Sequence, residues 1–295
     1  MRRSGIDRSV LKTRVITALS VLLIVLVALF GFADWGWAAF AFAVVIIACW
    51  EWSRLCQLNS TGMFFYVALS ILLSALICLI YIRGNTAAIE FTMLRQIALV
   101  MAAMFWLIVA PLWLANRWRP RSKCLLAGLG WLVVFPMGVA LLSLREISPW
   151  LLLSFAAIVW VADIAAYFAG RRFGRHKLAP AISPGKTVEG VLGGIIGVVV
   201  FFFVWQAVTA HTTVKNENWV IMLKSHSAVL FAVFVLLSLI SVLGDLFESW
   251  MKRGAGMKDS SNLLPGHGGV LDRIDALTST LPIAALYVTM MLSAK

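Results

Sequence analysis

A long apolar segment near the C-terminus, SAVLFAVFVLLSLISVLGDLF from Ser227 to Phe247, contains one charged residue, Asp245. A helix of about 20 apolar residues is long enough to cross the ~30 Å hydrocarbon core of a bilayer. This segment therefore predicts a transmembrane helix with an acidic residue close to its end.

The composition of the whole chain indicates the same class of protein. Of its 295 residues, 62% are hydrophobic and 13% are charged, more apolar side chain than a soluble fold of this length can bury. We expect an all-α, polytopic integral membrane protein with about nine spans, at residues 15–32, 35–50, 63–82, 96–115, 124–144, 149–170, 191–210, 227–247 and 276–292. The second span is short, so the first two could instead form one hairpin.

Positive charges are unevenly distributed between the predicted loops. If the N-terminus is cytoplasmic, 19 of the 25 Lys and Arg residues lie on the inner side and 6 on the outer side. The positive-inside rule then predicts an odd number of spans and an external C-terminus. The same distribution accounts for the net charge of +12, so nucleic acid is not an expected partner.

The N-terminal apolar run is expected to be retained as a helix, because it is too long for a signal-peptide core.

At the end of the apolar segment 227–247 the sequence becomes rich in charged residues. Residues 244–275 hold five of the 13 acidic residues and four of the 25 basic ones. At 100° per residue, Asp245, Ser249 and Lys252 share one stripe of the helix that leaves the bilayer. Glu248 is displaced by about 60° from Asp245, so we expect it to matter less.

A glycine-rich loop, PGHGG at residues 265–269, separates this helix from the next, where Asp272 and Asp275 are three positions apart and can share a face. Glycines allow backbone amides to approach an anion, and carboxylates are hard oxygen ligands suited to Mg²⁺. Ionisable groups at the mouths of membrane helices are costly and usually functional. The same stretch supplies four cations for phosphate oxygens: Lys252, Arg253, Lys258 and Arg273.

A second polar region follows the sixth predicted span. Asp163 is an uncompensated acid within that span, and we expect it to face the same site as Asp245. The next loop contains SPGKTVEG at residues 183–190. A Pro-Gly turn followed by Lys186 and Thr187 at the start of a helix would offer free amides and a cation to a phosphate.

The tripeptide GKT also imitates the end of a Walker A motif. The first glycine of that motif would fall at Pro180, and a membrane span rather than a strand precedes the loop, so a P-loop is not expected.

These motifs resemble a known family. The pattern Ser249-x-x-Lys252-Arg253, then Lys258-Asp259, PGHGG and LDRID, is similar over residues 249–275 to the signature of phosphatidate cytidylyltransferases, also called CDP-diacylglycerol synthases. Residues 183–190, followed by two glycines at 193 and 194, are similar to a second stretch shared by these enzymes. Weaker similarity reaches back to about Asp163, and the region before it is similar in hydropathy only.

The resemblance implies transfer of a cytidylyl group from CTP to phosphatidate, giving CDP-diacylglycerol and pyrophosphate, the first committed step to phospholipids. It implies Mg²⁺, with a second metal ion as an option, and a bacterial cytoplasmic membrane with the active site facing the cytoplasm. Membrane lipids are expected partners, and a homodimer is left open. The chemistry is expected in residues 149–295, with cytoplasmic loops at 171–190 and 248–275, whereas residues 1–148 carry little readable chemistry.

The implied roles divide the candidate residues into three groups. The catalytic candidates are Asp245, Ser249, Lys252, Asp272 and Asp275. The substrate-binding candidates are Ser183, Lys186, Thr187, Arg253, Lys258, His267 and Arg273. The metal candidates are Asp163, Asp245, Asp272 and Asp275, with Asp245 and Asp272 expected to share one ion. Lys186 and Lys252 are expected at helix ends in polar loops, where replacement would affect activity but not folding.

Two other functions are weighed against this one. In a transporter, Asp163, Asp245 and Glu248 would form an intramembrane ion path. The sequence shows no matching half-sequences, and its acids gather on one side of the membrane. A CDP-alcohol phosphotransferase would also handle CDP-lipids at an Asp-rich site, but its D-x-x-D-G-x-x-A-R pattern is absent because Ala276 follows Asp275.

Overall fold

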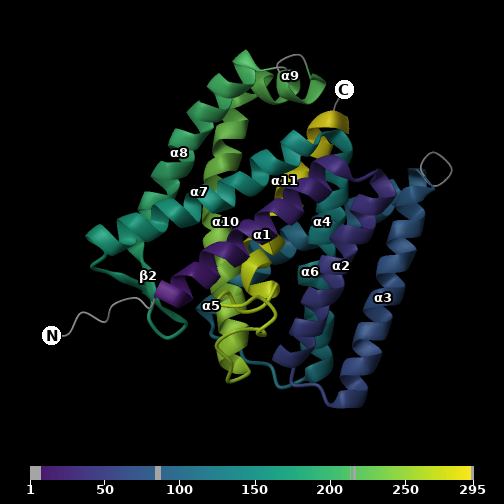
Figure 1. Ribbon diagram of the computed structural model, residues 1–295, viewed down its shortest axis with the longest axis vertical. Coiled ribbons are helices and arrows are strands. Elements are labelled where there is room, and N and C mark those ends of the chain that lie inside the picture. Colours follow the sequence, from purple (N-terminus) through teal and green to yellow (C-terminus); the bar gives the residue numbers. More distant parts are fainter. Residues whose placement is uncertain (1–7, 84–87, 213, 215–216, 294–295) are drawn as a thin grey trace.

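The computed structural model describes residues 8–83, 88–212, 214 and 217–293. It is 82% helical, and within the described residues nine helices are long and apolar enough to cross a membrane. The expected all-α, polytopic fold class is therefore confirmed (Figure 1).

Most of the helices follow one another with short connections; the two longer ones lie between α7 and α8 and between α10 and α11. The N-terminal group is α1 (Arg8–Gly31), α2 (Asp34–Leu55), α3 (Ser60–Ile82), α4 (Ala88–Met104), the π-helical turn η2 (Phe105–Val109), α5 (Ala110–Ala115) and α6 (Lys123–Ile147). The C-terminal group is α7 (Pro149–Phe173), α8 (Val188–His211), the short α9 (Asn218–Ser225), α10 (Ser227–Gly254) and α11 (Leu271–Ser293).

Several boundaries differ from the predicted spans, and two of the differences affect the site. Helix α10 continues seven residues past the predicted end at Phe247, and α11 begins five residues before the predicted start at Ala276. Most charged residues of the signature therefore lie on helices rather than in the loop. Helices α1 and α2 are joined by two residues, and each is long and apolar enough to cross a membrane by itself, as the nine-span expectation requires.

A small two-stranded sheet precedes α8. Strands β1 (Lys177–Ala179) and β2 (Ser183–Thr187) pair in antiparallel fashion, with Lys177 opposite Thr187. The expected Pro-Gly turn at a helix start is thus wrong in detail, because Pro184 and Gly185 lie within β2. The carboxylate of Glu189 closes this hairpin by accepting bonds from the backbone N–H groups of Arg175 (3.1 Å) and His176 (3.2 Å).

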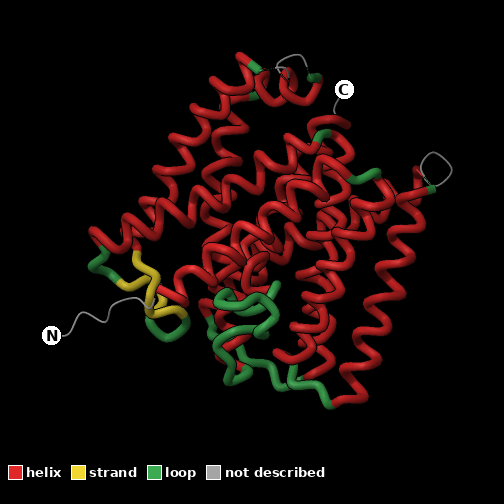
Figure 2. The backbone as a smooth tube through the Cα atoms, viewed as in Figure 1, coloured by secondary structure: helices red, strands yellow, loops and turns green. Residues whose placement is uncertain are grey.

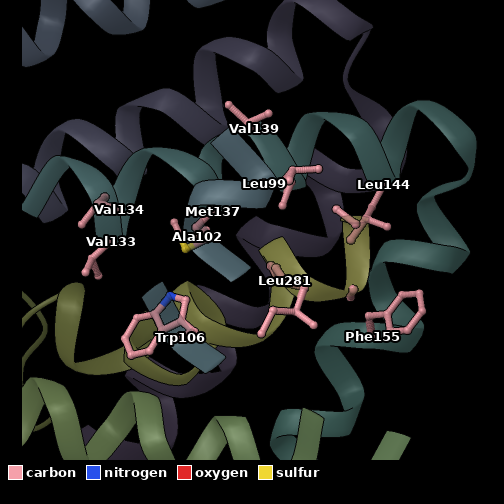
Figure 3. Packing of buried hydrophobic residues seen from close by; sticks show 14 of the residues in the cluster. Leu99, Ala102, Trp106, Val133, Val134, Met137, Val139, Leu144, Phe155 and Leu281 are labelled. Carbon is pink, nitrogen blue, oxygen red and sulfur yellow. The ribbon is translucent and has the colours of Figure 1, made fainter. Parts of the chain in front are cut away.

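The core lies where α2, α4, α6 and α11 meet. Figure 3 shows side chains of α4, α6 and α11 in contact there, among them Leu99, Met137 and Leu281, each at most 1% exposed. Burial of such side chains stabilises the fold by about 1.5–3 kcal/mol each where the alternative is water. This core fixes α11, and therefore the start of α11 that carries Asp272.

Helices α7 and α8 make the most extensive contact of any pair of elements. Glycines permit it: a Cβ added at Gly193 would lie 2.1 Å from the Cβ of Ala169, and one added at Gly197 would lie 2.5 Å from that of Ala165. Small residues on facing helices allow backbones to approach closely in a membrane. Gly193 of the second family stretch, together with Gly197, thus allows close packing of α8 against α7, the helix that carries Asp163.

The polar connections gather toward one end of the molecule. In Figures 1 and 2 the connections after α2, α5 and α10, together with the strand hairpin, lie in the lower half, whereas α9 and the C-terminus lie at the top. Two hydrogen bonds tie them together: Gln57 Nε2 after α2 donates to the Ala255 carbonyl after α10 (3.1 Å), and Trp250 Nε1 on α10 donates to the Trp118 carbonyl after α5 (2.9 Å).

Candidate active site

The first part of the site is a cavity of about 480 Å³ between α7, β2, α8 and α10, here called the Lys186 cavity. Lys186 Nζ on β2 lies 2.6 Å from Asp245 Oδ2 on α10, so strand and helix meet through an ion pair at the cavity wall. Its lining includes Asp163, Tyr167, Ser183, Lys186, Thr187 and Asp245.

Asp163 faces this cavity, as expected from the sequence. The charges that act on its carboxylate are those of Lys186, Asp245 and Arg273. The lining also includes Arg171, so two carboxylates and two basic side chains surround the same space and their formal charges balance.

Ser183 and Thr187 both line the cavity, but they differ in availability. The Thr187 hydroxyl is buried and accepts the backbone N–H of Gly190 at 3.1 Å, so it caps the N-terminus of α8. Ser183 has no such structural bond among the described contacts, and its hydroxyl is the freer one for a ligand.

The second part of the site is a buried group of three charges on α10 and α11, here called the Lys252 centre. Lys252 Nζ lies 2.5 Å from Glu248 Oε2 and 2.6 Å from Asp272 Oδ1, and all three side chains are at most 10% exposed. Lys252 is therefore buried on α10 and not in a polar loop, as had been expected, and its burial predicts that replacement would also affect folding. The predicted stripe of Asp245, Ser249 and Lys252 left out Glu248, although Glu248 pairs directly with Lys252.

Asp272 makes further bonds that shape the signature loop. Its Oδ2 accepts the backbone N–H of Ser260 (2.9 Å) and of Gly269 (2.7 Å). Gly268 has a φ of +84°, and a Cβ there would lie 2.7 Å from Asp272 Oδ2, so a glycine is required. Both oxygens of Asp272 are thus engaged with protein donors.

Glu51 on α2 is a residue of the site that sequence reasoning missed. It is fully buried, and it accepts the hydroxyls of Ser260 (3.0 Å) and Ser261 (2.5 Å) and the backbone N–H groups of Val270 (3.0 Å) and Leu271 (2.6 Å). One carboxylate thus holds both ends of the glycine-rich loop and the N-terminus of α11. The available signal was an acid inside an apolar segment.

The two parts of the site are connected through α10 and Asp275. The Ser249 hydroxyl lies 3.3 Å from Asp245 Oδ1, which confirms that these residues share a helix face. Asp275 lies one turn after Asp272 on α11, and the charges acting on its carboxylate include those of Asp245 and Lys186 from the cavity and of Lys252 from the Lys252 centre.

The remaining candidates form no ion pair with these groups in the described part of the chain. Arg253, Lys258 and Arg273 are exposed, and Arg253 Nη1 donates to the Met257 carbonyl at 3.0 Å. His267 Nδ1 is buried and has no hydrogen-bond partner within the described part of the chain. Of these four residues, His267 is therefore the strongest candidate for a ligand contact, through its unpaired Nδ1.

The carboxylates fit a divalent metal in chemistry but are not assembled around one. Oxygen donors of Asp163, Asp245 and Asp275 suit Mg²⁺, and their mutual repulsion would be relieved by a cation. Within the described residues, however, no group of three or more His, Cys, Asp or Glu side chains is arranged to hold a metal. The shared ion of Asp245 and Asp272 remains a prediction.

A polytopic helical membrane protein with carboxylates, lysines and a glycine-rich loop at one end has the features of an enzyme that acts on phosphates at the membrane surface. Comparison with known proteins makes the class definite. The sequence profile of the cytidylyltransferase family matches residues 12–291, and the chain belongs to this family of nucleotidyltransferases.

Three similar proteins carry the same name. The chain is 38% identical to a phosphatidate cytidylyltransferase of Haemophilus influenzae, with 94% of this chain and 98% of the relative covered. It is 37% identical to that of Pseudomonas aeruginosa (93% and 96% covered) and 33% identical to that of Staphylococcus epidermidis (92% and 97% covered). The family expected from the signature is therefore confirmed.

Proposed function

We propose that this protein is a phosphatidate cytidylyltransferase, which joins CTP and phosphatidate to give CDP-diacylglycerol and pyrophosphate. The observation that carries the proposal is the convergence of the family signature on two adjacent charged centres linked by α10. The names and the nearly full coverage of the relatives support it.

The reaction places few demands on proton transfer. The nucleophile is a phosphate monoester, and such a group has a second pKa of about 6, so it is mostly dianionic at pH 7 and requires no general base. The barrier comes from repulsion between two polyanions and from placing the attacking oxygen in line with the α-phosphorus. Basic side chains and backbone amides can lower both contributions.

The residues take roles that follow from their surroundings. Lys186 in its open cavity binds a phosphate of the substrate, with Ser183 as a hydroxyl donor. Lys252 holds Asp272, which in turn orders the glycine-rich loop for the second substrate. His267, whose buried Nδ1 lacks a hydrogen-bond partner in the described part of the chain, and the exposed Arg273 would contact the nucleotide or the leaving pyrophosphate. The groups most exposed to solvent, Arg253 and Lys258, attract the polyanions.

Nucleotidyltransferases generally use divalent metal ions. We propose Mg²⁺ held by Asp245 with Asp163 and Asp275, and with Asp272 when its bond to Lys252 opens. The ion would neutralise charge on the phosphates as it develops. Asp245 and Asp272 would then share one ion, as expected from the sequence, but only after the ion pair between Lys252 and Asp272 has broken.

Phosphatidate is proposed to enter sideways from the bilayer. Tyr167 lines the cavity and is 58% exposed, and its neighbour Phe168 is 64% exposed, so an apolar surface adjoins the polar opening. CTP would enter from the cytoplasm, onto which the positive-inside rule places this end of the molecule.

The cavity itself offers a direct test of this assignment. Asp245→Asn preserves size but removes the charge that pairs with Lys186 and would hold a metal ion. Formation of lipid-linked cytidine should fall at least tenfold, about 1.4 kcal/mol in the barrier, and excess Mg²⁺ should restore little of it. Glu217→Gln, at an exposed acid before α9 that lies outside the signature and lines neither part of the site, is the control. Equal turnover in the two variants would remove Asp245 from the proposed site.

A further inference from the structure

A second cavity, of about 450 Å³, lies beside the C-terminal end of α10 and shares no lining residue with the Lys186 cavity. Its walls come from the segment after α2, the connection between α5 and α6, and the last turns of α10. Its size falls within the range of about 300–1,000 Å³ typical of small-molecule sites. We call it the tryptophan cavity because Trp118 and Trp250 line it.

Three basic residues line this cavity: Arg119, Arg121 and Lys123. No acidic residue is among its described lining, and none of the three cations forms an ion pair with a carboxylate in the described part of the chain. The guanidinium carbon of Arg119 lies 4.3 Å from the ring centroid of Trp250, and the Lys123 ammonium donates to the carbonyl of Gln57. These contacts orient two of the cations without neutralising either.

The position of the cations is not explained by membrane topology alone. The positive-inside rule accounts for basic residues in this connection, but it does not require them to line a single cavity. An arginine placed over an indole ring keeps N–H donors that can bind phosphate oxygens. The walls also contain Leu55, Leu126 and Met251, so the cavity combines an anion site with an apolar surface.

We propose that the tryptophan cavity binds a phosphate group, separately from the substrates of the Lys186 cavity. At a membrane edge such a group comes from the headgroup of an anionic phospholipid or from free phosphate. The apolar wall and Trp118, which is 50% exposed, favour the lipid headgroup as its source.

The test uses the purified full-length protein in a zwitterionic detergent, titrated calorimetrically with short-chain phosphatidylglycerol, with short-chain phosphatidylcholine and with inorganic phosphate. The variant R119Q/R121Q/K123Q removes the three cations. Its matched control, R172Q/R175Q/K177Q, removes three exposed cations that line neither cavity. Phosphatidylglycerol should bind the wild type and the control alike and bind the cavity variant about tenfold more weakly.

Each outcome decides a part of the proposal. The same pattern with inorganic phosphate in place of phosphatidylglycerol would keep the site and assign it a soluble ligand. Equal binding of every titrant by the two triple variants would overturn the site. Should the cavity variant fail to fold, Arg121→Gln replaces it, because Arg121 makes none of the described hydrogen bonds. Unchanged binding by Arg121→Gln would then refute the proposal.

Discussion

Lys186 and Lys252 each neutralise a carboxylate on α10, but they differ in burial. The side chain of Lys186 is 22% exposed, whereas that of Lys252 is 10% exposed and contacts two carboxylates that are each 4% exposed. Removing one partner of a buried ion pair leaves an uncompensated charge, which costs about 3–5 kcal/mol. Removing a partner at the wall of an open cavity costs much less, because water can replace it.

Replacement by methionine should therefore separate the two lysines. Lys186→Met is expected to lower turnover at least tenfold, about 1.4 kcal/mol, with thermal stability close to that of the wild type. Lys252→Met should lose both activity and stability. Parallel assays of turnover and thermal unfolding in detergent check both variants, and a stable Lys252→Met protein would contradict the buried ion pair.

Glu51 offers a prediction about positioning. Glu51→Gln keeps the size but turns one acceptor oxygen into an NH₂ donor facing N–H groups of Val270 and Leu271. A buried donor without a partner costs about 1–3 kcal/mol, so stability and turnover should both fall. Glu90→Gln, an exposed acid in the first turn of α4, is the control and should change neither. If Glu51→Gln has the wild-type unfolding temperature and turnover, the loop is positioned by other contacts.

For single residues, the sequence identified the candidate site residues but not the side chains and backbone groups that they contact. The stripe of Asp245 and Ser249 followed from helical spacing and is present. Glu51 was missed because its bonds join residues 209 to 220 positions away, and no local pattern reports such contacts. Glu248 was discounted for its angle, yet a lysine four positions later reaches back to it along the same helix.

Among the elements, the contact between α7 and α8 depends on residues without side chains. Gly193→Ala would place a Cβ 2.1 Å from that of Ala169, so the helices must separate or shift, at a cost of about 1–3 kcal/mol. Because α7 carries Asp163 and α8 follows β2, such a shift also disturbs the Lys186 cavity.

We therefore expect Gly193→Ala to lower both the unfolding temperature and turnover. Gly128→Ala on α6 is the matched control, since a Cβ there meets nothing within 4 Å. Thermal unfolding and activity measurements on both variants check the prediction. Comparable stability of the two proteins would show that the helices tolerate a wider separation.

The elements themselves were largely predictable, because apolar segments long enough to span a bilayer have few alternatives. All nine expected spans correspond to helices of the described chain. The ends were not predictable, since α10 and α11 continue as polar helix where hydropathy no longer gives a signal. The hairpin of β1 and β2 was also missed, because its strands are only three and five residues long.

For the whole molecule, the orientation in the membrane remains a prediction from the 19 to 6 distribution of basic residues. It can be checked by cysteine labelling of intact cells, in a chain whose native cysteines are replaced by alanine. An impermeant maleimide should label Glu217→Cys directly and Asn262→Cys only after the cells are permeabilised. Both positions are exposed, so a reversed pattern would mean that the site faces the outside.

The most direct test of the central claim follows two labels of CTP. Purified protein in detergent is incubated with phosphatidate, Mg²⁺ and CTP labelled either at the α-phosphate or at the γ-phosphate. Our account predicts that the α label enters a lipid-soluble cytidine product and that the γ label is released in equal amount as pyrophosphate. Folded protein that leaves the α label entirely in the aqueous phase, or releases γ label as single phosphate, would contradict it.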